Sequence, residues 1–271
     1  MARVIVITSG KGGVGKTTST SNIGMALASL GYNTLLMDAD VGLRNLDLLL
    51  GLENRIIYTG LDVLAQTCRL EQALITDKRQ SKLTFFPLSS NQTKTALLPS
   101  QIKEIVNLVE ENYDFIFIDC PAGIDEGFQT AISEAQEAIV VVTPEVPSIR
   151  DADKVIGLLI AQNIKKISLL VNRIRPKMVQ TDDMMSIDDV KNILGVPIVG
   201  VIPDSEQVII ASNRGEPLVL EEKISLPGLA FENTAKRILG EDVKFLDLEV
   251  SNSRNLVKRF FKTFVKKPNS N

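Results

Sequence analysis

The sequence has no histidine and no tryptophan, and only two of its 271 residues are cysteines, Cys68 and Cys120. The missing histidine removes the commonest general base and metal ligand, so acid–base or metal chemistry must use carboxylates, lysines, hydroxyls or the backbone. The two cysteines form no C-x-x-C pair, which excludes a zinc or iron–sulfur site built within one chain. We expect both thiols to be reduced, as in a cytosol-like compartment.

Long apolar runs are also missing. No run in the sequence reaches the ~20 residues that a membrane-spanning helix needs. A strand-like run at residues 4–7 leaves no room for a signal or transit peptide before it, so we expect none. Hydrophobic residues make up 44% of the chain, which is enough for the core of one large α/β domain or of two small ones.

One glycine-rich stretch, residues 10–18 (GKGGVGKTT), organises the rest of the chain. It meets the pattern G-x-x-x-x-G-K-[ST] between a strand-like run and a helix-like run. Glycines let backbone N–H groups gather around an anion, and the helix N-terminus adds a partial positive charge. Lys16 can reach the β- and γ-phosphates of a nucleotide, and Thr17 offers a hydroxyl to Mg²⁺. The predicted nucleotide-binding residues here are Gly10, Lys11, Gly12, Gly13, Val14, Gly15, Lys16, Thr17 and Thr18; a chance glycine-rich turn is the alternative.

Short apolar segments alternate with helical patterns along the chain. Strands are expected at 4–7, 33–37, 83–88, 115–118, 138–142, 167–171 and 198–202, and helices at 20–30, 60–74, 99–111, 127–135, 148–162, 187–194, 205–212 and 229–239. This alternation predicts a single doubly wound α/β domain over residues 1–240, with a mostly parallel sheet and helices on both faces. Several strands end in polar residues, which should meet at the carboxyl edge of the sheet, where such folds bind ligands.

Three stretches together carry a specific resemblance: Lys11 within the loop, residues 38–47 (DADVGLRNLD) and residues 119–124 (DCPAGI). Lys11 resembles the signature lysine of the deviant Walker A ATPases, a P-loop NTPase group that includes partition ATPases, the nitrogenase iron protein and arsenite-pump ATPases. The other two stretches are similar to the switch regions of its ParA/MinD family. The resemblance runs from Ala2 to the C-terminus.

The resemblance implies a Mg²⁺-dependent ATPase that cycles on and off a membrane and helps to place the cell- or plastid-division site. ATP binding would drive dimerisation and membrane attachment, and hydrolysis would release the protein. In family members the residue at Lys11 crosses the dimer interface to the nucleotide of the other subunit. The catalytic residues implied in this way are Lys11, Lys16 and Asp40, which would act by positioning and electrostatics without a covalent intermediate.

The resemblance also assigns roles to polar residues at the strand ends. Asp119 follows four apolar residues, as a Walker B carboxylate does, and would hold Mg²⁺ through water with the help of Thr17. Asp40 would orient the attacking water, and Asp38 would lie near the metal. From the residues alone, Asp119 could instead cap the next segment, and the other two aspartates could belong to a solvated loop.

Two further sets of residues follow from the same resemblance. Positions that contact adenine in relatives are matched by Asn172, Pro203 and Asp204, although a strand-end asparagine and a turn are the plainer interpretation. A MinC-like division inhibitor and a MinE-like ATPase activator would bind the dimer near Arg44, Asn45, Asp151 and Asp153, although exposed charges on a helix are usually just solvated.

The C-terminal stretch is basic and amphipathic. From Arg254 on there are six basic residues and no acidic one, which leaves 24 basic against 33 acidic residues in the rest of the chain. A helix would gather one apolar stripe: Leu256, Val257, Phe260, Phe261, Phe264 and Val265. Residues 254–271 therefore predict a helix and tail lying on an anionic membrane surface, after a flexible tether at 241–253. A helix of 254–267 would be roughly 20 Å long, too short to span a bilayer core of ~30 Å.

Two alternatives for this stretch remain: a helix docked on the core, and a nucleic-acid-binding tail. A ParA-like ATPase that acts on DNA is the alternative function, but the acidic body of the chain counts against the basic footprint that such binding needs. We expect a homodimer when ATP is bound, an anionic membrane as partner, and no specific nucleic acid. The expected location is cytoplasmic and peripheral on the inner face of the cell membrane, or the stroma and inner envelope of a plastid.

Overall fold

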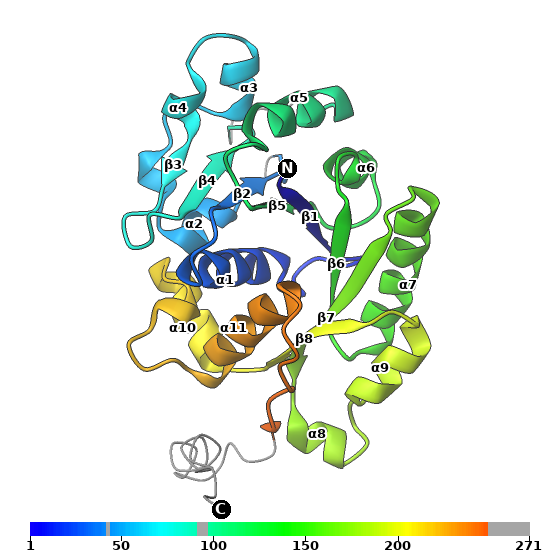
Figure 1. Cartoon of the computed structure of the whole chain (residues 1–271). Coiled ribbons are helices and arrows are strands. Elements are labelled where there is room, and N and C mark those ends of the chain that lie inside the picture. The colour runs from blue at the N-terminus through cyan, green and yellow to red at the C-terminus, as the bar shows by residue number, and fades with distance from the viewer. Residues whose placement is uncertain (42–43, 91–96, 249–271) are drawn as a thin grey trace, which may run out of the picture.

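An eight-stranded sheet organises the described residues, which are 1–41, 44–90 and 97–248 of this computed structural model (Figure 1). The strands are β1 (Arg3–Thr8), β2 (Thr34–Asp38), β3 (Ile75–Thr76), β4 (Leu83–Pro87), β5 (Phe115–Asp119), β6 (Glu137–Val142), β7 (Lys166–Ile174) and β8 (Ile198–Pro203). Their order is β3-β4-β2-β5-β1-β6-β7-β8. The pairing of β3 with β4 is antiparallel and the other pairings are parallel. The predicted doubly wound, mostly parallel sheet is therefore confirmed, while β3 was not predicted.

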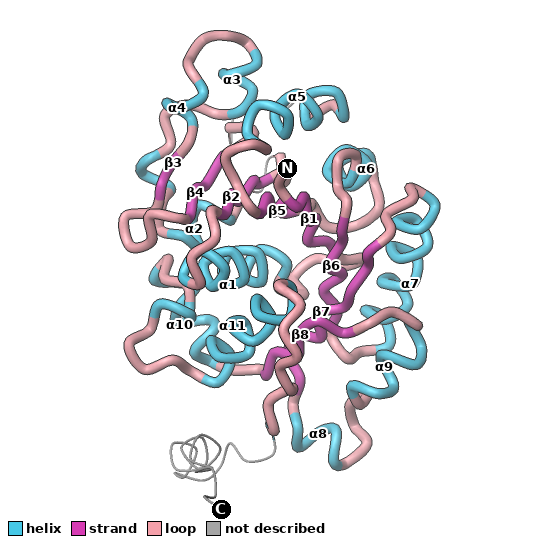
Figure 2. Tube along the Cα trace, in the orientation of Figure 1, coloured by secondary structure: helices cyan, strands magenta, loops and turns pink. Residues whose placement is uncertain are grey.

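Helices cover both faces of this sheet (Figure 2). They are α1 (Lys16–Ser29), α2 (Leu46–Leu50), α3 (Gly60–Leu64), α4 (Leu70–Ala73), α5 (Pro99–Val109), α6 (Glu126–Ile132), α7 (Val146–Ala161), α8 (Pro176–Gln180), α9 (Ile187–Leu194), α10 (Glu206–Arg214) and α11 (Leu226–Ile238). Two apolar clusters result: one packs α1, α2, α10 and α11 on the sheet, and the other packs α5, α6, α7 and α9 on the opposite face. The strands are buried on both sides, which explains why they read as continuous apolar runs.

Helix α1 carries the glycine-rich loop at its N-terminus and is buried along most of its length. Its small residues allow this burial. A side chain at Gly24 would lie about 2.5 Å from the Leu36 side chain on β2, so α1 can approach the sheet only with glycine at this position. The close packing of α1 against the sheet and α11 thus fixes where this helix starts, and it fixes the position of the loop as well.

The helix predicted over residues 60–74 is wrong, because the structure has two short helices there. Thr59 caps α3 by accepting a hydrogen bond from the N–H of Asp62, whose carboxylate in turn accepts from the N–H of Thr59 at 2.8 Å. Gln66 then takes a positive φ of 58°, which a continuing helix does not allow. The Thr67 hydroxyl donates to the carbonyl of Asp62 at 2.9 Å and stabilises this reversal before α4 begins.

Residues 241–248, which we call the C-terminal strap, follow α11 and lie against the domain. Arg237 donates hydrogen bonds to backbone carbonyls of the strap. Leu246 contacts the apolar clusters of both faces, and Leu248 is buried. The first part of the predicted flexible tether is therefore held against the domain, at least to Leu248. The rest of that tether and the predicted membrane helix fall within residues 249–271, outside the described residues.

Arg79, in the turn between β3 and β4, joins three segments. Its guanidinium pairs with Asp77 at 2.6 Å and donates to the carbonyls of Leu50 at 2.6 Å and Gly215 at 2.9 Å. These carbonyls lie at the C-terminal ends of α2 and α10, where the helix dipole favours a cation. Gly51 and Gly215 end the two helices with φ of 62° and 64° and pack so closely that a side chain on Gly215 would not fit.

Replacing Arg79 with methionine should lower the free energy of unfolding by about 2–4 kcal/mol. This is less than the loss expected for a fully buried ion pair, because the Arg79 side chain is 35% exposed and water screens its charge. Burial alone would raise the pKa of Asp77, but hydrogen bonds from Arg79 hold it below its ordinary value. The pair therefore stabilises the fold above the ordinary Asp pKa of about 4, and this contribution is lost as the pH falls through the lowered pKa. Urea unfolding at neutral and acidic pH measures both effects.

The matched control is the double variant Asp77→Asn/Arg79→Met, in which no carboxylate is left unpaired. It should recover part of the lost stability at neutral pH. A single Arg79→Met variant as stable as the wild type at neutral pH would contradict this account of the junction.

Candidate functional site

The predicted site residues meet at the carboxyl edge of the sheet. The glycine-rich loop follows β1, Asp38 and Asp119 end β2 and β5, and Pro203 ends β8. Parallel registers place these ends side by side, since Asp119 is level with Asp38 on one neighbour and with Ile7 on the other. The structure thus brings together the residues that the sequence placed at one edge.

The glycine-rich loop takes the backbone form that its glycines allow. Gly13 has φ of 76° and Gly15 has φ of 101°, a region that other residues rarely adopt. Gly15 is also the N-cap of α1 and supplies no side-chain cap, so the first N–H groups of the helix keep their hydrogen-bonding capacity. Such unpaired N–H groups at a helix N-terminus are suited to bind a phosphate.

Two neighbouring elements press against the loop and fix its shape. A side chain on Gly10 would clash with the backbone of Asp151 on α7, and one on Gly15 would clash with the amide of Asn172 on β7. The same Asn172 amide donates to the carbonyl of Val14 at 2.7 Å. Asn172, predicted to contact adenine, is buried, and in this structure it holds the phosphate loop.

Asp119 is buried beside the start of α1, as its predicted metal role requires. It accepts a hydrogen bond from the hydroxyl of Thr20 at 2.9 Å, and the hydroxyl of Thr17 is close enough to lower its pKa. Burial raises the pKa of Asp119, while these hydroxyls and the nearby Lys16 counter the rise. Thr17 and Asp119, the hydroxyl and the carboxylate of the predicted magnesium site, therefore lie close together.

Asp38 has a structural task at the same edge. One carboxylate oxygen accepts from the N–H of Asp40 at 3.0 Å, and the other accepts from the N–H groups of Asn45 and Leu46 at 3.2 and 3.1 Å. Burial and the charge of the adjacent Asp119 both raise the pKa of Asp38. It thus anchors the segment that leads to α2, and this arrangement fits shaping of that segment better than direct contact with a metal.

The three predicted catalytic residues, Lys11, Lys16 and Asp40, differ in exposure. Lys16 is only 8% exposed, and its charge acts on both Asp40 and Asp119. Asp40 is half-buried, and burial raises its pKa while Lys16 opposes the rise. Lys11 is exposed. Lys16 and Asp40 therefore face the site, and Lys11 is accessible to a second molecule.

The donors at this edge fit a nucleotide-bound Mg²⁺. Within the described ranges no group of three His, Cys, Asp or Glu side chains could hold a metal ion by itself. One hydroxyl (Thr17) and one buried carboxylate (Asp119) are the small donor set that Mg²⁺ uses when phosphates and water complete its shell. Cys120, next in sequence, is a free thiol whose burial raises its pKa to about 12, so it does not compete as a ligand.

On the predicted adenine side, Pro203 and Asp204 lie next to the end of β7. Pro203 is level with Ile174 in the sheet, and the N–H of Asp204 donates to the carbonyl of Ile174 at 3.0 Å. The carboxylate of Asp204 pairs with Arg175 at 2.7 Å. Asn172 lies in the same strand, so the three predicted residues share one part of the edge.

The predicted partner-binding residues do not form one exposed group. The Arg44 side chain is 9% exposed, pairs with Asp47 at 2.9 Å and donates to the carbonyl of Ser89 at 3.0 Å. It therefore holds the segment after β2 in place, and its predicted role as a partner contact stays a prediction. Asn45 and Asp153 are exposed, and Asp151 is half-buried beside Gly10.

Sequence reasoning missed Thr20 and the loop contact of Asp151. Thr20 lies one helical turn after Thr17, and this i, i+3 spacing places both hydroxyls on one face of α1 toward Asp119. That spacing could have identified Thr20. No local signal in the sequence indicates that Asp151 packs against Gly10, because the contact depends on how α7 lies on the sheet.

The predicted membrane residues Leu256, Val257, Phe260, Phe261, Phe264 and Val265 lie outside the described residues. In the part of the chain that is described, no helix combines the length and the apolar character needed to cross a bilayer.

Comparison with known proteins agrees with this geometry. The family described as "CobQ/CobB/MinD/ParA nucleotide binding domain" matches residues 5–218. A protein of Emiliania huxleyi named "Putative septum site-determining protein MinD" is 68% identical over 267 residues, which is 98% of this chain and 98% of that protein.

Solved structures give the same assignment. The MinC:MinD cell division protein complex of Aquifex aeolicus matches with a TM-score of 0.83 and 48% identity, covering 90% of this chain and 98% of the other. The septum site-determining protein MinD of Pyrococcus horikoshii complexed with Mg-ADP matches with a TM-score of 0.78 and 29% identity, covering 90% and 100%. The chain, with its phosphate loop, buried Asp119 and parallel sheet, belongs to the MinD/ParA family of nucleotide-binding P-loop proteins.

Proposed function

We propose that this chain is a Mg²⁺-dependent ATPase that dimerises on ATP, attaches to a membrane and helps to determine the site of division. The observation that carries the proposal is the buried Asp119, which accepts a hydrogen bond from Thr20 and lies close to Thr17, at the base of an uncapped, glycine-rich helix start. The names of its relatives, which include septum site determination and an Mg-ADP complex, support it.

The residues divide the chemistry between them. The loop N–H groups and Lys16 would hold the phosphates, and Thr17 with Asp119 would hold Mg²⁺, which when bound neutralises charge that develops on the β- and γ-phosphates. Asp40 is half-buried close to Lys16, where it would orient the attacking water. Asp38 anchors the backbone of Asp40 and so keeps that carboxylate in place.

A second copy of the chain would complete the site. Lys11 is exposed beside the loop, and it would contact the nucleotide of the other subunit. In other phosphoryl-transfer enzymes, a cation supplied to the transferring phosphoryl group in this way raises the rate of hydrolysis about 10³–10⁵-fold. Hydrolysis would therefore depend on dimerisation.

Residues 254–271 would bind the membrane, and a dimer would bring two of these tails to it. A single tail gains from burying its apolar stripe and from basic residues near anionic lipid, and it loses a similar amount in ordering the chain. Once one tail of a dimer is bound, the second tail binds at a high effective concentration. ATP would therefore control attachment by changing the number of linked tails from one to two.

The partners of this chain would be a MinC-like division inhibitor, as in the Aquifex complex, and a MinE-like activator. A ParA-like role on DNA is less well supported, because a relative named for septum site determination spans 98% of the chain. The acidic balance of residues 1–253 also opposes binding to phosphate backbones. A location on the inner face of a cell membrane or plastid envelope follows from the same proposal.

Lys16→Ala should weaken ATP binding about 100-fold, because Lys16 would make charge-assisted contacts with two phosphates of its own subunit. Lys11→Ala should have an affinity for ATP within about threefold of that of the wild type. In the presence of an activator and membrane, however, its rate of ATP hydrolysis should be about 10³-fold lower. Equilibrium binding and single-turnover hydrolysis separate the two effects. Wild-type hydrolysis by Lys11→Ala under those conditions would exclude a role in the second subunit.

Asp40→Ala should bind ATP and form a dimer, yet hydrolyse about 10²-fold or more slowly, because water positioning is lost while the phosphate cradle remains. Asp119→Ala should weaken the Mg²⁺ dependence of ATP binding itself. Nucleotide titrations with and without Mg²⁺ make the comparison, with the exposed Asp188→Ala as control. Unchanged Mg²⁺ dependence in Asp119→Ala would refute its metal role.

Vesicles of anionic lipid should retain the protein with ATP but not with ADP, and Phe260→Glu should abolish retention while leaving nucleotide binding unchanged. Added salt should weaken retention, because part of the attraction is screened charge. Co-sedimentation measures all three. Retention that is equally tight with ADP and ATP would argue against control by dimerisation.

A further inference from the structure

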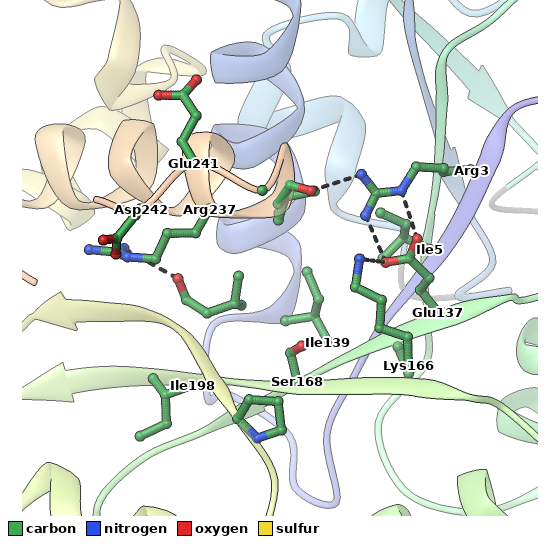
Figure 3. Close-up of a pocket in the computed structure, with 15 residues that line it drawn as sticks. Arg3, Ile5, Glu137, Ile139, Lys166, Ser168, Ile198, Arg237, Glu241 and Asp242 are labelled. Atoms are coloured by element: carbon green, nitrogen blue, oxygen red, sulfur yellow. Dashed lines mark hydrogen bonds and ion pairs between the residues drawn. The ribbon is translucent and has the colours of Figure 1, made fainter. Parts of the chain in front are cut away.

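The C-terminal strap starts at the edge of the sheet opposite the phosphate loop. Figure 3 shows this edge, where Arg3, Glu137 and Lys166 form one charged group and Arg237 lies across a pocket of about 440 Å³ from it. Arg3 pairs with Glu137 at 2.7 Å, and Lys166 pairs with the same carboxylate at 2.9 Å. These cations are engaged with the protein, so the pocket is a structural junction.

Arg3 links this junction to the end of α11. Its guanidinium donates to the carbonyl of Ile238 at 2.8 Å while two of its nitrogens bind Glu137. The last turn of α11 is thereby tied to the first residue of the central strand β1. Gly200 on β8 allows α11 to approach closely, since a side chain there would clash with Thr234. The base of the strap is therefore rigidly placed.

Arg237 holds the strap itself. Its Nε and Nη2 atoms donate to the carbonyls of Val243 at 2.8 Å and Lys244 at 2.9 Å, and Nη1 donates to the carbonyl of Val199 on the edge strand β8 at 3.2 Å. The Phe245 ring stacks on the guanidinium, with its centroid 4.2 Å from Cζ. One side chain thus binds the strap to the edge of the sheet.

The strap crosses from one face of the sheet to the other. Figure 1 shows it leaving the end of α11, passing β8 and ending beyond it. Leu246 contacts both apolar clusters, and the buried Leu248 belongs to the cluster on the α7 and α9 face. The described part of the chain therefore ends at a defined place beside β8.

We propose that Arg237 is a positioning residue for membrane attachment, because it fixes the place from which the C-terminal tail leaves the domain. This inference rests on the proposed function of residues 254–271. With the strap bound, Leu248 is held, and Arg254 lies 6 positions after it in the sequence; with the strap released, the held part of the chain would end at Gly240, 14 positions before Arg254. Effective concentration falls roughly as the −3/2 power of tether length, so release should weaken the second attachment about 3–4-fold.

The test compares full-length wild type with Arg237→Ala on vesicles of phosphatidylserine and phosphatidylcholine. Retention with ATP should fall about 3–4-fold, while the weak one-tail retention with ADP and the affinity for ATP should not change. Hydrogen exchange at Glu241 and Val243, whose N–H groups are bonded at 3.1 and 3.0 Å, should become faster. Arg237→Lys should not rescue retention, because an ammonium group cannot reproduce the planar fork.

Lys236→Ala is the matched control, since Lys236 lies in the same turn but pairs with Glu232 on its own helix at 2.6 Å. It should behave as wild type in every measurement. If Arg237→Ala does not fold, Phe245→Ala removes the stacked ring alone and should give a smaller fall with faster exchange of the strap.

Each outcome decides one question. If the wild type shows no ATP-dependent retention, the proposed function fails, whatever the strap does. If the wild type is retained and Arg237→Ala releases the strap without losing retention, the exit position does not matter and this inference is wrong. If exchange at Glu241 and Val243 is unchanged in Arg237→Ala, Arg237 is not the anchor and the inference is equally wrong.

Discussion

Two buried carboxylates side by side are the constraint from which the rest of this site follows. Asp38 and Asp119 end adjacent strands in register, and each is at most 2% exposed. Burial of two neighbouring negative charges is unfavourable unless donors and cations surround them. Here the donors come from the start of α1 on one side and from the backbone before α2 on the other. The carboxyl groups of Asp38 and Asp119 thus hold in place the start of α1 and the segment before α2, which form the site.

This requirement reaches far from the nucleotide edge. Asp38 fixes the start of α2, while Arg79 fixes its end and the end of α10 at a single guanidinium. Helix α10 begins just after Pro203 and Asp204, the predicted adenine side. Two short helices that start at opposite sides of the site therefore end at the same ion pair. Such a frame keeps both sides of the site at a fixed separation.

The sequence was most informative where chemistry and local pattern coincide. The loop glycines, Lys16 and Asp119 could be identified because a phosphate site requires those residue types at those spacings, and the strands because parallel strands are apolar throughout. Contacts between distant segments were not accessible. Arg79 and Arg237 look like ordinary surface arginines in sequence, yet each binds carbonyls from elements that only the fold brings together.

The same limit explains the local errors. Residues 60–74 have helical spacing, but the positive φ of Gln66 breaks the helix, and glutamine carries no signal for that conformation. Arg44 was predicted as a partner contact from the family resemblance, and the sequence did not indicate that its side chain pairs with Asp47. The strap has a polar, mixed composition typical of a tether, and its place on the domain depends on contacts of Arg237, Leu246 and Leu248 that the local sequence does not indicate.

The central strand β1 lies between the phosphate loop and the helix that leads to the strap. Thr8, at its carboxyl end, leads into the phosphate loop, while Arg3, at its other end, holds the helix from which the strap leaves. Six residues of strand place these ends roughly 20 Å apart through the most buried part of the molecule. In the proposed function, ATP would control the membrane tail from the far end of this strand by a different route, between subunits, through the number of tails that a dimer presents.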